Sequence, residues 1–130
     1  MREVGRLRAR VRGRLIVLGG VPNFQIYTGG YATSPYECVS KPMLSADCAT
    51  TPLDGGVQRQ HRRVNAAFKA ALGDGIQFLD PFDALCDEKA CRNFDDHSHP
   101  IYSDSAHLSE DGAVFVVRRL SDVLDLMRRD

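Results

Sequence analysis

The sequence predicts an α/β fold in which a parallel sheet is flanked by helices. Two observations bear on the fold class and on the number of domains. Short apolar runs alternate along the chain with longer segments whose apolar residues recur every three or four positions, in the order helix, strand, loop, helix, strand, loop, helix. Strands that are separated by helices usually join a parallel sheet. In addition, a length of 130 residues suits one domain.

Residues 15–18 and 76–79 are the two predicted strands. The first is apolar throughout, as expected of a strand that is covered on both faces, and it ends at Gly19-Gly20. The second ends at Asp80-Pro81, because proline cannot donate to a sheet ladder. Two parallel strands make a poor core, since each strand needs cover on both faces and a neighbour at each edge. We therefore expect the chain to be the second half of a larger domain.

Residues 3–12, 57–72 and 110–128 are the three predicted helices. Ser109 is a good N-cap for the third helix. His61 falls on the apolar stripe of the second helix and is interpreted as a histidine at the edge of the core. The predicted inner faces are Val4, Leu7 and Val11 in the first helix; Val57, Val64, Phe68, Ala71 and Leu72 in the second; and Ala113, Val116, Val117, Leu120, Leu124 and Met127 in the third.

Two further segments, residues 22–53 and 82–103, are predicted to be loops. Each contains two cysteines, which suggests two local disulfides, Cys38–Cys48 and Cys86–Cys91. Three pairings are possible, and the sequence alone does not choose between them; four reduced cysteines are the remaining alternative. Disulfides persist only in an oxidising compartment.

The formal net charge is zero, so the chain as a whole offers no general electrostatic attraction to nucleic acid or to an anionic membrane. The first 14 residues are an exception, with six arginines against Glu3. They indicate either a basic arm or a solvated helix face, and we favour the second interpretation. No apolar run is long enough to span a bilayer, and Leu15–Val21 is too short for a convincing secretory signal. We expect the chain as given to encode neither export nor a membrane anchor.

Residues 102–113 carry the chemistry that the sequence predicts. Asp104 and His107 are three residues apart just before the last helix, so one turn of chain can bring the carboxylate against one imidazole nitrogen. A general base and the acid that orients it have this arrangement in nucleophilic catalysis. Taken alone, however, the Asp-x-x-His spacing is weak, and it more often reflects a turn-forming aspartate beside a solvated histidine.

The longer pattern strengthens the interpretation. The block Tyr102-Ser103-Asp104, His107-Leu108-Ser109 and Gly112-Ala113 resembles the last sequence block of the SGNH hydrolases. It is most similar to the SGNH domains that are fused to membrane acyltransferases of the acyltransferase-3 family. The segments that support the resemblance are Val17–Pro22, Val64-Asn65, Ile76–Pro81, and Leu85-Cys86 with Cys91.

The resemblance implies a flavodoxin-like three-layer α/β fold, of which residues 1–130 would be a single partial domain, the C-terminal portion. It implies serine-type acyl transfer or ester hydrolysis on O-acyl groups of a cell-surface polysaccharide or glycan, in the periplasm or another extracytoplasmic compartment. His107 would activate the serine, and Asp104 would hold His107. A membrane acyltransferase domain upstream in a full-length protein would be a partner. No cofactor, metal or nucleic acid is expected.

The sequence departs from the family at the nucleophile. It contains no Gly-Asp-Ser motif and no Gly-x-Ser-x-Gly elbow of the unrelated α/β-hydrolases. The glycine and asparagine that would complete the oxyanion hole are expected upstream of Met1, and Asn23 does not fit that role. We therefore expect the isolated chain to have little or no esterase activity.

Three alternatives remain open. The first is a catalytically inactive truncated remnant or a misassigned start. The second is nucleic-acid or acidic-lipid binding by the basic N-terminal helix, although its apolar spacing predicts a helix that packs inward. The third is a small metal-binding module, for which the histidine spacing is tighter than zinc sites usually have. The ligands of that module would be Cys86, Cys91, His97 and His99.

Overall fold

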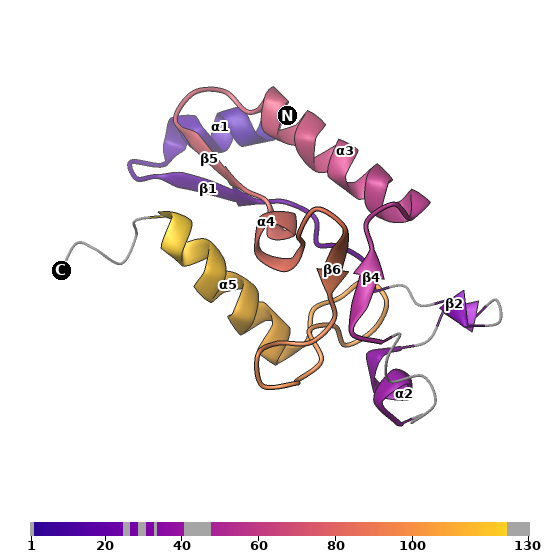
Figure 1. Cartoon of the computed structure of the whole chain (residues 1–130). Coiled ribbons are helices and arrows are strands. Elements are labelled where there is room, and N and C mark those ends of the chain that lie inside the picture. The colour runs from indigo at the N-terminus through magenta and orange to yellow at the C-terminus, as the bar shows by residue number, and fades with distance from the viewer. Residues whose placement is uncertain (1, 25–26, 29–30, 33, 41–47, 125–130) are drawn as a thin grey trace.

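The computed structural model describes residues 2–24, 27–28, 31–32, 34–40 and 48–124 (Figure 1). The helices are α1 (Arg2–Arg10), α2 (Pro35–Ser40), α3 (Gly56–Ala71), α4 (Pro81–Leu85) and α5 (Glu110–Leu124). The strands are β1 (Leu15–Leu18), β2 (Tyr27–Thr28), β3 (Tyr31–Ala32), β4 (Thr50–Pro52), β5 (Ile76–Leu79) and β6 (Ala90–Arg92). None of the helices in the described ranges is both long enough and apolar enough to cross a membrane.

β1 and β5 form the parallel sheet that the sequence predicts. Leu15 lies opposite Ile76, and Leu18 lies opposite Leu79. α3 and α5 lie on opposite sides of this pair of strands (Figure 1). The predicted bounds of both strands are confirmed, and those of α1 and α3 differ by one or two residues at each end; the predicted end of the last helix lies outside the described residues. Within the described ranges, β1 pairs with β5 alone, so its second edge is open.

The two predicted loops contain more regular structure than the sequence indicates. β2 and β3 pair antiparallel over two residues, and β4 pairs antiparallel with β6, with Thr51 opposite Cys91. β4 belongs to the first predicted loop and β6 to the second, so this pair joins them. The prediction of unstructured loops was wrong because strands of two or three residues are too short to show an apolar alternation.

Both disulfides suggested by the cysteine spacing are present: Cys38 is bonded to Cys48, and Cys86 to Cys91. The first disulfide lies inside the main core, and Cys91 belongs to a smaller cluster with Leu53 and Phe82. The main core consists of Phe24, Cys38, Cys48, Leu79, Ala84, Leu85, Ile101, Tyr102, Val116 and Leu120. The core therefore joins the first loop, the end of β5 and α5.

The apolar stripe predicted for α3 is not its buried face. Val64 is 57% exposed and Phe68 is 36% exposed, and Ala71 is exposed as well. The buried side chains of α3 are instead the polar Gln58 and Asn65. The helix is thus held mainly by hydrogen bonds on this side, and part of its apolar stripe faces solvent.

The predicted inner face of α5 is correct only in part. Val116 and Leu120 are buried, whereas Ala113 is exposed and Val117 is 61% exposed. The side chains of Leu124 and Met127 lie outside the described residues. A sheet of two strands is too narrow to cover the full apolar width of a helix, which explains why one side of α5 is left uncovered.

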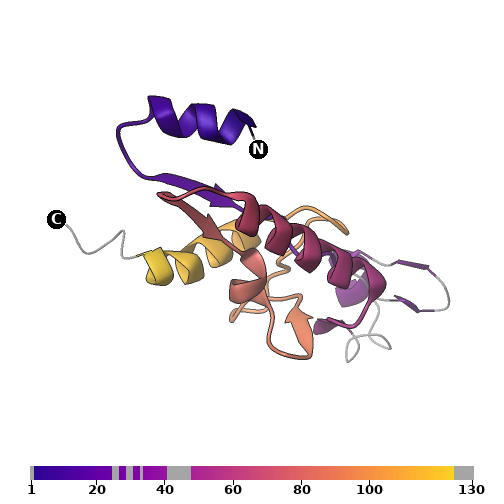
Figure 2. The ribbon, with the colours of Figure 1, turned by 90° about the horizontal axis from the view of Figure 1, so that it is seen from above.

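α1 also differs from its prediction. Leu7 is 54% exposed and Val11 is 38% exposed, while Val4 is half-buried. The expectation that this helix packs inward along its apolar side was therefore wrong. Seen from above, the ribbon of α1 lies at one edge of the described chain (Figure 2), and the half-buried Val4 and Arg8 lie on it.

Asn65 of α3 links the carboxyl ends of both strands of the parallel sheet. Its Oδ1 accepts from the backbone N–H of Gly20 at 2.9 Å, and its Nδ2 donates to the carbonyl of Gly20 and to Asp80 Oδ1, each at 2.8 Å. A Cβ atom on Gly19 would lie 2.9 Å from Asn65 Nδ2, so this glycine lets the helix approach the strand end. The buried Asn65 amide thus holds the backbone in place after β1 and after β5.

Gln58 and His61 continue the same polar face of α3 along the next residues of the loop. The Gln58 amide donates to the carbonyl of Asn23, and its Oε1 accepts from the Asn23 N–H at 3.1 Å. The half-buried His61 ring lies with Nδ1 3.3 Å from the carbonyl of Val21. The side chains at 58, 61 and 65 therefore bind successive backbone groups of residues 20–23.

We expect Asn65→Ala to lower the free energy of unfolding by about 2–4 kcal/mol, because it removes the partners of part-buried backbone groups of Gly20. Urea denaturation followed by circular dichroism measures the change. Val64→Ala, one residue away on an exposed position, is the control and should change stability by less than about 0.5 kcal/mol. Equal losses in the two variants would show that the Asn65 hydrogen bonds do not stabilise the fold.

We expect Gly112→Ala to destabilise the protein by at least about 3 kcal/mol, because a Cβ at this position would overlap the carbonyl oxygen of Ile101. Backbone atoms cannot swing away as a flexible side chain can, so the start of α5 would have to shift. Gly56→Ala at the start of α3, where a Cβ meets nothing within 4 Å, is the matched control and should be neutral or slightly stabilising. Thermal unfolding of the three proteins compares them.

Candidate active site

Asp104 and His107 lie at the tip of a short loop that folds back on itself before α5. Tyr102 forms an isolated antiparallel bridge with Leu108. The Ser103 N–H donates to the carbonyl of His107 at 2.9 Å. Because Tyr102 is fully buried, the base of the loop is anchored in the core while its tip projects outward.

The structure brings the two predicted site residues into contact. The Nδ1 atom of His107 lies 2.8 Å from Oδ2 and 3.1 Å from Oδ1 of Asp104. Both side chains are exposed, at 79% for His107 and 56% for Asp104. Within the described part of the chain, the Nε2 atom of His107 has no hydrogen-bond partner, so it is free to exchange a proton with another molecule.

The same carboxylate also shapes the turn. Asp104 Oδ1 accepts from the backbone N–H of Ala106 at 2.7 Å and of His107 at 2.8 Å. Chiefly the Ala106 N–H, and then the His107 side chain and N–H, lower the pKa of Asp104 to about 2. The aspartate is therefore ionised at neutral pH, and it orients the imidazole and the backbone of the turn together.

Ser109 fixes the site loop to the start of α5. Its Oγ accepts from the Gly112 N–H at 2.9 Å and donates to the carbonyl of Pro100. In addition, the Ser109 N–H donates to the carbonyl of Ile101 at 2.9 Å. The predicted N-cap is thus confirmed, and the cap joins the helix to both sides of the loop.

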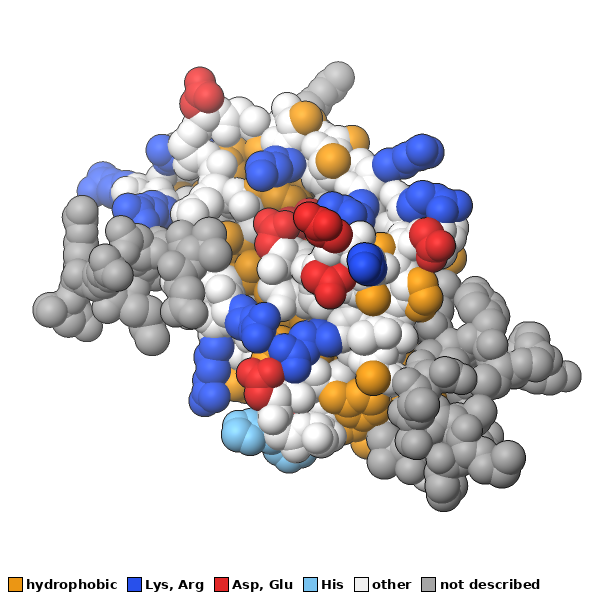
Figure 3. Space-filling view, in the orientation of Figure 1, with side chains coloured by type: hydrophobic (Ala, Val, Ile, Leu, Met, Phe, Trp, Pro, Cys, Tyr) orange, Lys and Arg blue, Asp and Glu red, His pale blue; other side chains and the backbone are white. Residues whose placement is uncertain are grey.

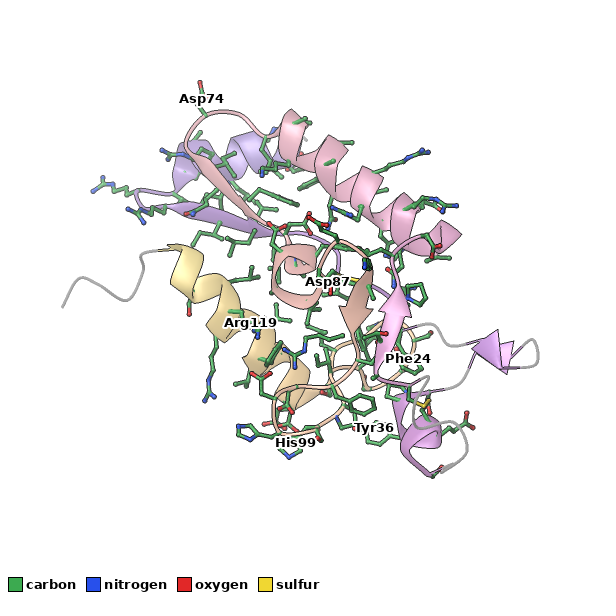
Figure 4. All side chains as sticks on the ribbon, viewed as in Figure 1. Phe24, Tyr36, Asp74, Asp87, His99 and Arg119 are labelled. Carbon is green, nitrogen blue, oxygen red and sulfur yellow. A yellow bond between two sulfur atoms is a disulfide. The ribbon has the colours of Figure 1, made fainter. Side chains whose placement is uncertain are left out.

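Phe24 connects the site loop to the segment that α3 holds. Its backbone N–H donates to the carbonyl of Ser105 at 3.0 Å, and its buried ring lies 6.2 Å from that of Tyr102 (Figure 4). The Tyr102 hydroxyl has no hydrogen-bond partner among the described residues, and burial raises the pKa of this phenol. Ring packing and one backbone hydrogen bond therefore hold the site loop against the segment that contains Phe24.

Sequence reasoning missed the residues that support the site from a distance. Phe24 gave no signal, because a single aromatic residue in a long loop has no period. Gln58, His61 and Asn65 did give one, since polar residues at spacings of three and four mark one face of a helix. The apolar residues of α3 instead predicted that a neighbouring face of the helix is buried.

No serine hydroxyl in the described ranges hydrogen bonds to the ring of His107. Ser103 does bind His107, but its hydroxyl donates to the backbone carbonyl of His107 at 3.2 Å and not to the imidazole. The Ser109 hydroxyl is engaged by the cap. Ser45 lies outside the described residues. The described part of the chain thus contains an Asp–His pair in contact, without a serine hydroxyl bound to the imidazole.

The structure contradicts the two cysteine ligands of the alternative metal-binding module. Cys86 and Cys91 are bonded to each other, so neither is available as a thiolate ligand. His99 Nδ1 lies 3.2 Å from Asp95 Oδ2, and the ring centroids of His97 and His99 are 6.1 Å apart. Within the described ranges, no group of three or more potential ligands is arranged to hold a metal ion.

The low pKa of Asp104 predicts how stability depends on pH. Its value of about 2 in the folded protein lies below the ordinary value of 3.8. The ionised carboxylate therefore contributes stability above about pH 4. This contribution is lost as the pH falls toward 2. Melting temperatures at pH 4, 3 and 2 should fall less in Asp104→Asn than in the unmodified protein, and a carboxyl carbon of Asp104 that titrates near 3.8 would contradict the interpretation.

Comparisons with known proteins agree with the fold and with the family that the sequence resembles. A family model described as the SGNH domain fused to AT3 domains matches residues 1–122. No curated protein matches the chain in sequence. The structure is similar to the periplasmic domain of a lipopolysaccharide acetyltransferase from Salmonella ser. Paratyphi A, with a TM-score of 0.59 and 20% sequence identity.

That similarity covers 86% of this chain and 42% of the Salmonella chain, so the chain spans less than half the length of the structure that it matches. At 20% identity the likeness shows the fold alone. The family match extends over most of the chain, from α1 into α5. The chain therefore belongs to the family of SGNH domains that are fused to AT3 domains.

Proposed function

We propose that the chain is the C-terminal portion of an SGNH-type serine acyltransferase or esterase with a flavodoxin-like three-layer fold. Its substrates would be O-acyl groups of a cell-surface glycan. The observation that carries the proposal is the 2.8 Å contact between Asp104 Oδ2 and His107 Nδ1, in a chain that belongs to this family. His107 would be the general base, and Asp104 would orient it.

The geometry suits this chemistry. The carboxylate engages Nδ1, which favours the tautomer whose Nε2 accepts a proton, and it stabilises the imidazolium that forms. A serine hydroxyl would attack the acyl carbonyl, and its proton would pass to Nε2 of His107. The same nitrogen would then return the proton to the leaving alcohol, so that acyl groups move by way of an acyl-serine.

The serine would come from outside these 130 residues. No serine hydroxyl in the described ranges hydrogen bonds to the His107 ring, and the sequence has no Gly-Asp-Ser motif. The open edge of β1 and the uncovered apolar sides of α3 and α5 offer a place where a further part of the same domain would pack. A preceding segment of a longer polypeptide, or a second chain, would supply it.

Several observations support an extracytoplasmic setting for this activity. Two disulfides need an oxidising compartment to persist. The similar Salmonella structure is a periplasmic domain, and its printed description is a lipopolysaccharide acetyltransferase. An AT3 domain in the full-length protein would be the partner that exchanges acyl groups with this site, and an acylated polysaccharide would be the substrate.

A catalytically inactive remnant is the second candidate function. The observation that favours it is the exposed position of the His107 ring, whose Nε2 has no hydrogen-bond partner in the described part of the chain. The two candidates differ in the mass of the native protein. The proposed enzyme requires a polypeptide or complex larger than 14.4 kDa, whereas the remnant would be found at that mass.

In the native protein or complex, we expect His107→Ala to lower kcat/KM for an aryl acetate by about 10³- to 10⁴-fold, since the base is lost. Asp104→Asn should cause a comparable loss, because the imidazole would adopt the wrong tautomer. His97→Ala, at another exposed histidine of the same region, is the control and should keep full activity. The isolated 130-residue chain should be inactive; hydrolysis by this chain that disappears in His107→Ala would contradict the need for an outside serine.

A further inference from the structure

The N-terminal arginines form a cationic surface with few acidic neighbours. The first 14 residues contain six arginines and a single acidic residue, Glu3, which pairs with Arg6 at 2.8 Å. In the described part of the chain, no carboxylate lies within ion-pair distance of Arg8, Arg10, Arg12 or Arg14. Basic side chains gather at the left edge of the molecule, where the turn between α1 and β1 lies (Figure 3). The zero net charge of the whole chain conceals this local excess.

Apolar side chains lie among these arginines and face solvent. Leu7 and Val11 are exposed, and the arginines at 10, 12 and 14 that flank them are exposed as well. The opposite side of α1 faces the body of the protein, because the half-buried Arg8 guanidinium lies against Gly75. The free side of α1 and the residues that connect it to β1 thus present both apolar and cationic groups.

We propose that this N-terminal basic surface, made of Leu7, Arg10, Val11, Arg12 and Arg14, docks on a bilayer that contains anionic phospholipid. The end of α1 and the turn after it would bind such a surface as basic amphipathic segments do, with the apolar side chains at the headgroup boundary and the arginines on lipid phosphates. The exposed Leu7 and Val11 favour a bilayer over nucleic acid, since a phosphodiester backbone offers no apolar region to receive them. The proposal requires neither a nucleophile nor a glycan, so it is independent of the proposed enzymatic function.

Co-sedimentation with vesicles tests the docking. The 130-residue chain should bind vesicles of phosphatidylglycerol and phosphatidylcholine, and it should not bind vesicles of phosphatidylcholine alone. Binding should weaken as salt is raised. Each arginine near an anionic surface contributes about fivefold to partitioning. The variant Arg10→Gln/Arg12→Gln/Arg14→Gln should therefore bind about 100-fold more weakly.

Two further variants separate the contributions. Leu7→Ser/Val11→Ser keeps every charge and should still weaken binding several-fold, because the apolar contact with the bilayer is lost. Arg62→Gln/Arg63→Gln/Arg118→Gln removes the same number of charges from exposed positions on α3 and α5, and it should bind within about twofold of the unmodified protein. Unchanged circular dichroism and melting temperature verify that each variant is folded.

Four outcomes would overturn the proposal. The first is equal binding to the two kinds of vesicle. The second is an equal loss in Arg10→Gln/Arg12→Gln/Arg14→Gln and in the matched charge control, which would mean a nonspecific charge effect. The third is binding to duplex DNA that is tighter than binding to vesicles and depends on the same arginines. The fourth is a dimer in solution that Leu7→Ser/Val11→Ser abolishes while the unmodified protein ignores vesicles, which would make this surface an interface between two copies.

Discussion

The polar face of α3 is the constraint on which the rest of the structure depends. Asn65 binds the chain after β1 and the aspartate after β5, so the ends of both parallel strands are held by one amide. Gln58 extends this hold to Asn23, and the next residue, Phe24, hydrogen bonds to the site loop at Ser105. Because an unpaired buried amide or backbone group is costly, each of these bonds favours a single path for the loop.

The geometry of the Asp–His pair depends on local hydrogen bonds more than on distant packing. The Asp104 carboxylate accepts from two backbone N–H groups of its own turn, and the capping hydroxyl of Ser109 ties the loop to α5. Gly112 lets the helix start against the carbonyl of Ile101. These contacts hold the pair in one geometry, as the proposed role of His107 as a general base requires.

Apolar side chains are left uncovered at the parallel sheet and on the two helices that flank it. Leu18 at the end of β1 is exposed beside an open strand edge, and Val64 and Val117 are exposed on the two flanking helices. A parallel sheet is normally covered on both faces and paired on both sides of its inner strands. The proposed enzyme would satisfy these groups with its remaining elements, and the same elements would bring the serine to His107. The N-terminal basic surface differs, because its apolar groups lie among arginines without an ion-pair partner in the described part of the chain, as expected of a surface that docks on a bilayer.

The fold class, the bounds of both parallel strands, the two close pairs of cysteines and the position of the Asp–His block could be read from the sequence, whereas the structure was needed to choose among the possible disulfide pairings. These features are local: a run of four apolar residues, two close cysteines or an Asp-x-x-His before a helix can be read from neighbouring positions. Only the tertiary structure decided that Gln58 and Asn65, and not Val64 and Phe68, form the buried side of α3, and that β4 pairs with β6. The physical reason is that burial depends on what lies opposite a helix. Here a polar loop backbone lies opposite α3, and no third strand lies beside β1 in the described part of the chain.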